Sequence, residues 1–121
     1  MTPRRGTTGG SLNRANEPGV LILTSLAGGE KHGYALARDI EAFAGVTLGP
    51  GTLYGAITRL EERGLIEATA GDDRRRPYRI SAAGRAALQA AVTDMRVIAD
   101  EGATRLGLAL VPGRLGLGWT P

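Results

Sequence analysis

The chain has 121 residues, which is enough for one small domain, and 42% of them are apolar, 22% charged and 4% aromatic. The formal net charge is +3, and the basic residues are almost all arginine, with Lys31 as the only lysine. The lack of cysteine excludes disulfides and thiolate metal sites, and a single histidine, His32, excludes a multi-histidine metal site.

The first third of the chain predicts a tail followed by a buried helix. Residues 1–16 are rich in Gly, Thr, Ser and Arg without an apolar period, so we expect a disordered basic tail. Pro18 suits the first turn of a helix and two glycines follow Ala27, which predicts a helix over 18–27. The apolar run Val20–Leu26 within it is too short to span a bilayer, so we expect a soluble, cytoplasmic protein.

Two more helices are expected before the first strand. Apolar residues recur at helical spacing over 32–44, and Gly45 is placed to end that helix. A third helix is expected over 50–63, with Gly64 as its C-terminal stop. Its buried stripe consists of Leu53, Ile57 and Leu60.

A hairpin and a long helix complete the pattern. Alternation predicts a strand over 65–70, and 78–80 is the return strand after a loop over 71–77. Ser81 is expected to cap a last helix over 82–105. That helix carries a seam of heptad spacing, which predicts dimerisation. The seam consists of Leu88, Val92, Met95, Ala99, Gly102 and Leu106.

The expected fold is mainly α with a small β-hairpin, namely a winged helix-turn-helix with a long C-terminal dimerisation helix. Its expected parts are the basic tail 1–16, a winged helix-turn-helix DNA-binding domain 17–81, a dimerisation helix 82–106 and a flexible tail 107–121.

The third helix is the candidate reading element. Opposite its buried stripe it presents Thr52, Gly55, Arg59 and Glu62. Small Thr52 and Gly55 allow close approach to base edges, and Arg59 can reach a phosphate or a guanine. Two glutamates balance two arginines in this helix, and the alternative is an ordinary solvated face.

The loop and return strand carry the basic charge. Four arginines against two aspartates give +2 over eight residues. We interpret the arginines as contacts to phosphates or to a minor groove, with a solvated hairpin tip as the alternative. These arginines are Arg74, Arg75, Arg76 and Arg79.

From about residue 20 to 106 the chain resembles PadR-like transcriptional regulators of the short branch with a single C-terminal helix. The motifs appear in the expected order, and their combination is specific. They are His32-Gly33-Tyr34, Pro50-Gly51-Thr52-Leu53-Tyr54, Arg59-Leu60-Glu61, Gly64-Leu65-Ile66, Tyr78-Arg79-Ile80-Ser81 and Ala83-Gly84. The chain departs from the family pattern at Gly49 and Gly55, where Ser and Pro are usual.

The resemblance implies a homodimeric regulator, a repressor, that binds a two-fold-related operator on double-stranded DNA. It also implies that His32, Tyr34 and Tyr54 help hold phosphate. Local packing is the alternative for all three, and His32 is also a candidate cap. For Tyr54, next to the buried Leu53, packing is favoured.

The same residues bear on other partners and functions. No cofactor and no membrane partner are expected, and an effector would be a hydrophobic small molecule bound against the last helix. One alternative function is a winged-helix protein-interaction module without DNA binding. A small enzyme is disfavoured because the chain has one histidine, no cysteine and no carboxylate pair predicted to share a pocket.

Overall fold

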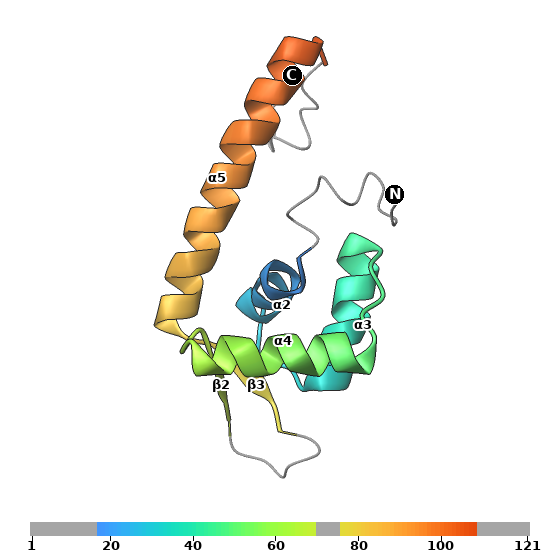
Figure 1. Cartoon of the computed structure of the whole chain (residues 1–121), viewed down its shortest axis with the longest axis vertical. Helices are drawn as coiled ribbons and strands as arrows, with labels where there is room; N and C mark the ends of the chain where they lie inside the picture. The colour runs from blue at the N-terminus through green and yellow to red at the C-terminus, as the bar shows by residue number, and fades with distance from the viewer. Residues whose placement is uncertain (1–16, 70–75, 109–121) are drawn as a thin grey trace, which may run out of the picture. The chain divides into compact units, whose positions relative to one another are not determined.

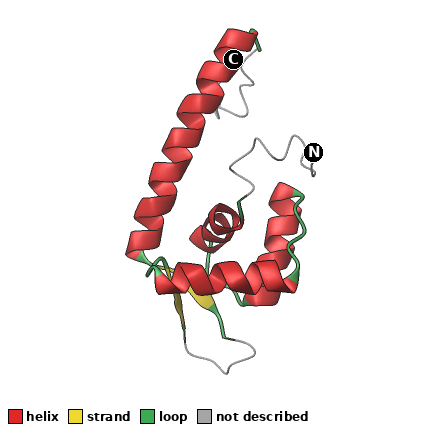
Figure 2. Cartoon of the chain, in the orientation of Figure 1, coloured by secondary structure: helices red, strands yellow, loops and turns green. Residues whose placement is uncertain are grey.

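The computed structural model describes residues 17–69 and 76–108. It contains three helices, a two-stranded antiparallel hairpin and a long last helix (Figures 1 and 2). These are α2 (Pro18–Ala27), α3 (Gly33–Ala44), α4 (Pro50–Glu62), β2 (Ile66–Ala68), β3 (Tyr78–Ile80) and α5 (Ala82–Leu106). The fold class is as predicted, and each predicted element is present with ends shifted by two residues at most. The predicted tail 1–16, residues 109–121 of the predicted tail 107–121, and Arg74 and Arg75 lie outside the described residues.

The chain divides into two compact units, one reaching to Ala90 and the other starting at Ala91. The first unit holds α2, α3, α4, the hairpin and the beginning of α5. The described part of the second unit is the rest of α5 and the two residues that follow it. Within the described residues, no helix is both long and apolar enough to cross a membrane.

Helix α2 is the centre of the first unit, and it contacts α3, α4 and β3. In Figure 1 it is seen nearly along its axis, with α4 running across the view beside it. Its consecutive residues Leu21, Ile22 and Leu23 are all buried, as expected for a helical run that is apolar on every side. Leu26 of α2 also belongs to this core cluster. The other helices and the hairpin complete it with Leu36, Ile40, Leu53, Ala56, Ile57, Leu60, Ile66 and Ile80.

Glycines end α3 and the turn after α4, as the sequence indicates. Gly45 has φ 70° and its N–H donates to the Glu41 carbonyl at 3.0 Å. Gly64 has φ 75° and directly follows Arg63, the C-cap of α4. Both glycines adopt the left-handed conformation that a side chain disfavours, so the chain reverses sharply at these two points.

The hairpin has a register that alternates buried and exposed pairs. Ile66 pairs with Ile80 on the core side, and the next pair, Glu67 with Arg79, faces outward. Lys31, in the connection between α2 and α3, forms an isolated antiparallel β-bridge with Tyr78. Its N–H donates to the Tyr78 carbonyl at 3.1 Å, and the Tyr78 N–H donates back to the Lys31 carbonyl at 2.9 Å. The hairpin is therefore tied to the helices at its base.

Candidate nucleic-acid interface

Helix α4 buries one side and presents the predicted reading residues on the other. Thr52, Arg59 and Glu62 are exposed, and Gly55 is half-buried. Arg59 Nη1 lies 3.6 Å from where a Cβ on Gly55 would stand, so the guanidinium folds back over this glycine. The face of α4 that carries the predicted DNA-contacting residues is thus outside the core, and the Arg59 side chain lies along it.

Tyr54 packs against the first residue of α3 while staying half exposed. A Cβ on Gly33 would collide with the Tyr54 hydroxyl and would stand 2.7 Å from its Cζ. Gly33 is itself buried. The glycine of the His32-Gly33-Tyr34 motif is therefore explained by the close approach of Tyr54, and the packing alternative for Tyr54 describes its position.

His32 and Tyr34 lie on either side of Gly33 in the chain. His32 occupies the N-cap of α3 with an extended backbone, but its side chain makes no capping hydrogen bond within the described part of the chain. Tyr34 is 67% exposed, so packing at the helix junction does not describe its position. Its hydroxyl accepts a hydrogen bond from Arg38 Nη1 at 3.0 Å. Arg38 is a residue that the sequence did not single out as a candidate.

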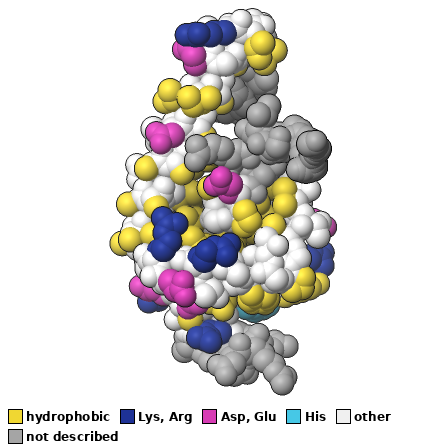
Figure 3. Space-filling model, viewed as in Figure 1, with side chains coloured by type: hydrophobic (Ala, Val, Ile, Leu, Met, Phe, Trp, Pro, Cys, Tyr) yellow, Lys and Arg dark blue, Asp and Glu magenta, His cyan; other side chains and the backbone are white. Residues whose placement is uncertain are grey.

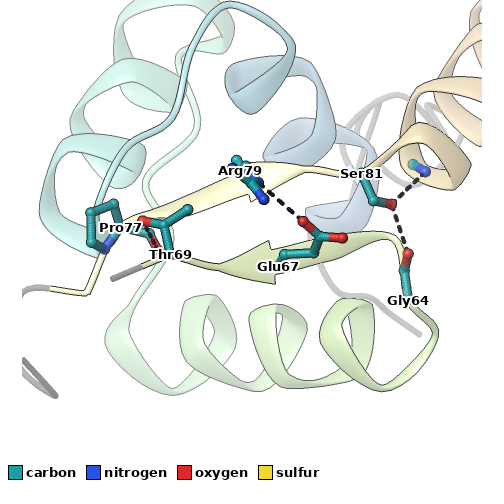
Figure 4. A network of polar contacts seen from close by, with 7 residues as sticks. Gly64, Glu67, Thr69, Pro77, Arg79 and Ser81 are labelled. Carbon is teal, nitrogen blue, oxygen red and sulfur yellow. Dashed lines mark hydrogen bonds and ion pairs between the residues drawn. The ribbon is translucent and has the colours of Figure 1, made fainter. Parts of the chain in front are cut away.

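The base of the hairpin is less basic than the arginine count indicates. The Nε of Arg79 donates to Glu67 Oε1 at 3.0 Å across the strand pair, and both side chains are exposed (Figure 4). Glu67 lies on the other strand, outside the eight residues that carry the charge of +2. The positive charge of Arg79 is locally compensated, so the basic character of the wing depends on the arginines nearer its tip.

Tyr78 is the first residue of β3 and is half-buried. Burial raises the pKa of its hydroxyl, and the Glu61 carboxylate on α4 raises it further. The Arg76 guanidinium lowers the same pKa, and Tyr54 adds a smaller upward effect. Tyr78 is therefore neutral at physiological pH.

Ser81 joins the end of α4 to the start of α5, as Figure 4 shows. Its Oγ donates to the Gly64 carbonyl at 2.7 Å and accepts from the Gly84 N–H at 3.0 Å. The second bond is the predicted N-cap. Gly84 is buried at this junction. A Cβ on it would collide with the Leu65 carbonyl oxygen and stand 2.8 Å from Ile80 Cγ1, so a side chain does not fit there.

The only lysine has a structural role that the sequence analysis missed. Lys31 Nζ donates to the carbonyls of Ser25 at 2.7 Å and Gly29 at 3.1 Å, at the end of α2. It lies 4.0 Å from Asp39 Oδ2, which also accepts the Ser25 hydroxyl at 2.6 Å. A cation among the last carbonyls of a helix is favoured by the helix dipole. One lysine in an arginine-rich chain was the available signal, but its partners could not be read from spacing.

Charged side chains of both signs are mixed on the surface. On the face drawn in Figure 3, Lys and Arg side chains lie beside Asp and Glu side chains and do not merge into one basic patch. This agrees with the mixed charges of α4, which holds one arginine and two glutamates, and with the pairing of Arg79.

The predicted seam residues of α5 fall in both units. Leu88, in the first unit, is half-buried and packs against that unit's core. In the second unit Val92 and Met95 are half-buried, while Ala99 is exposed and Leu106 is 75% exposed. The exposure of these residues therefore rises toward the end of the helix.

The model of the transcriptional regulator PadR-like family matches residues 22–90, more than half of the chain. The chain belongs to this family. It is a PadR-like transcriptional regulator with a winged-helix fold. The family is one of transcriptional regulators, which are generally not enzymes.

Individual relatives agree with this assignment. The chain is 44% identical over 70 residues to the transcriptional regulator Rv3488 of Mycobacterium tuberculosis, a match covering 55% of this chain and 64% of that protein. It is 43% identical over 76 residues to an uncharacterized 37.1 kDa protein in transposon TN4556 of Streptomyces fradiae, covering 63% of this chain and 22% of that protein. The chain thus spans less than two thirds of either relative.

A crystal structure of a PadR family transcription regulator from Clostridium difficile superposes with a TM-score of 0.66 at 23% identity. The match covers 75% of this chain and 98% of that one. At this identity the likeness concerns the fold.

Proposed function

We propose that this PadR-like regulator binds double-stranded DNA as a homodimer and represses transcription from a two-fold-related operator. The observation that carries the proposal is the outward face of α4. Thr52, Gly55 and Arg59 lie outside the core, on the second helix of a helix-turn-helix in a chain of this family. In that motif the second helix enters the major groove and its leading residues meet base edges.

We assign the contacts to the DNA sugar-phosphate backbone mainly to the elements next to α4, namely α3 and the wing. We place His32, Tyr34 and Tyr54 near phosphates at the start of α3 and α4, and Arg76 and Arg79 on the wing, with Arg74 and Arg75 in its loop. Since α4 carries one arginine against two glutamates, phosphate attraction must come from these flanking groups.

Dimerisation is assigned to the part of the α5 seam that follows Leu88. Val92, Met95, Ala99 and Leu106 keep the heptad spacing, and their exposure increases toward the end of the helix. A two-fold dimer would present two reading helices to two half-sites about one helical turn, roughly 34–36 Å, apart. A hydrophobic small-molecule effector would act by changing the spacing of those helices.

Footprinting on the DNA upstream of the protein's own gene tests binding and symmetry together. We expect two protected half-sites whose centres are about 10–10.5 base pairs, or a multiple of this, apart. Changing Arg74, Arg75 and Arg76 together to Ala should weaken the salt dependence of binding, by a slope of about 0.9 for each phosphate that is no longer neutralised. The rival function, a protein-interaction module, predicts no salt-dependent affinity for any duplex.

A further inference from the structure

Resting on the proposed DNA binding, we infer that Tyr34 and Arg38 form a two-donor phosphate site on the outer face of α3. They stand one helical turn apart, and Arg38 Nη1 donates to the Tyr34 hydroxyl at 3.0 Å. The Arg38 Cζ lies 5.8 Å from the centre of the Tyr34 ring, so the guanidinium is held at the hydroxyl end of the ring.

The chemistry of the pair suits an anion. A tyrosine hydroxyl that accepts one hydrogen bond still has its own O–H to donate, and arginine has five N–H donors. Accepting a bond from a cation polarises the phenol and strengthens its O–H as a donor. One phosphate group can therefore receive the Tyr34 O–H and a remaining Arg38 N–H at the same time, while the hydrogen bond between the two side chains stays in place.

The charge of Arg38 is available for this role. Its polar partner is the Tyr34 hydroxyl, and in the described residues no carboxylate forms an ion pair with it. The neighbouring acids of α3 are engaged elsewhere. Asp39 accepts from Ser25 and faces Lys31, while Glu41 Oε2 accepts from Thr47 at 3.1 Å.

The position of the pair also agrees with the docking of a helix-turn-helix. Tyr34 is the second residue of α3 and directly follows Gly33, against which Tyr54 of α4 packs. The outward faces of α3 and α4 therefore meet at this point. In the motif, the first helix crosses the sugar-phosphate backbone while the second helix enters the groove. From the sequence, Tyr34 is expected to hold phosphate together with His32 and Tyr54, and Arg38 is not among the candidates.

The test measures binding to a fluorescein-labelled duplex of mixed sequence over a series of salt concentrations, using the full chain. For Arg38→Ala we expect the slope of log affinity against log salt to shrink by about 0.9 per protomer. For Tyr34→Phe, which keeps the charge, we expect the slope to hold and the affinity to fall about threefold to tenfold. Arg38→Lys should keep the slope and lose affinity, because an ammonium lacks the planar fork.

The matched control is Arg96→Ala, which removes the same charge from an exposed helical position on α5. Circular dichroism melts should show the wild-type midpoint for all four variants, since each side chain is exposed. The inference is overturned if Arg38→Ala behaves like Arg96→Ala, or if Tyr34→Phe binds as wild type does. If the wild-type chain itself shows no salt-dependent binding, it is the proposed function that fails.

Discussion

Gly33 is the residue on which the two helices of the helix-turn-helix approach each other. Replacing Gly33 by Ala should push the Tyr54 ring off α3, because the new Cβ would occupy the place of the hydroxyl. Tyr54 is half exposed and its ring end can move, so we expect a loss of about 1 kcal/mol in the free energy of unfolding, at the low end for overpacking. Urea titrations of the single and double variants with Tyr54→Ala measure this coupling.

The coupling between Gly33 and the Tyr54 ring can be checked with a matched control. In the Tyr54→Ala background, Gly33→Ala should cost nothing, since the colliding group is gone. Gly51→Ala, which meets no atom within 4 Å, should be neutral or stabilising in both backgrounds. Equal costs of Gly33→Ala with and without the Tyr54 ring would show that the contact does not determine the choice of glycine.

Tyr78 makes the free energy of unfolding depend on pH, and the sign of that dependence follows from its raised pKa. Below about pH 10, the ordinary tyrosine pKa, the phenol is neutral in both the folded and the unfolded state. Above it the unfolded state ionises first, so the free energy of unfolding falls until the pH passes the raised pKa of the folded state. Urea unfolding at about pH 8 and about pH 11 should therefore show a smaller alkaline loss for Tyr78→Phe than for wild type. An equal loss in both proteins would contradict a buried, proton-holding hydroxyl.

Among the elements, the start of α5 is the most tightly specified junction. Gly84→Ala would place a methyl group against the Leu65 carbonyl, and backbone cannot move aside as a side chain can. We expect a loss of about 1–3 kcal/mol in the free energy of unfolding. Gly102→Ala, later in the same helix, meets no atom within 4 Å and should stabilise by about 0.5–1 kcal/mol. Denaturant midpoints of the two variants should move in opposite directions, and parallel shifts would rule out the close approach.

The elements were predictable from the sequence because their signals are local. Pro18, Pro50, Gly45 and Gly64 mark helix ends through their own backbone preferences, and apolar spacing marks the buried faces. Contacts between elements were not predictable in the same way. The pairing of Glu67 with Arg79 depends on the register of a hairpin whose loop is too long to set it.

Three other contacts could not be predicted from the sequence either. They are the packing of Tyr54 against Gly33, the hydrogen bond from Arg38 to Tyr34, and the hydrogen bonds of Lys31 at the end of α2. The first and third join residues whose distance in space is set by packing. The second has helical spacing, but an arginine four residues from a tyrosine is too common to single out. Candidate residues on α4 were found because a helix with one buried stripe necessarily presents its other face.

At the scale of the whole molecule, the two units differ in how they are stabilised. The first has a core of twelve buried apolar residues. The described part of the second is the remainder of one helix with Val97, Ile98 and Leu106 largely exposed, and an isolated helix gains little stability in water without a surface to pack on. A partner for α5 would supply that surface, which is why we assign association to the second unit and folding to the first.

Met95 and Val97 offer a matched test of which face of α5 associates. They are two residues apart, so on a helix they point to nearly opposite sides, and only Met95 belongs to the heptad seam. Met95→Arg should give a monomer by light scattering at micromolar concentration, because a charge buried in a helix seam is left without a partner. Its DNA affinity should fall as the second half-site is lost, while the core of the first unit stays folded. Val97→Arg should remain a dimer, and the reverse outcome would place the interface on the other side of α5.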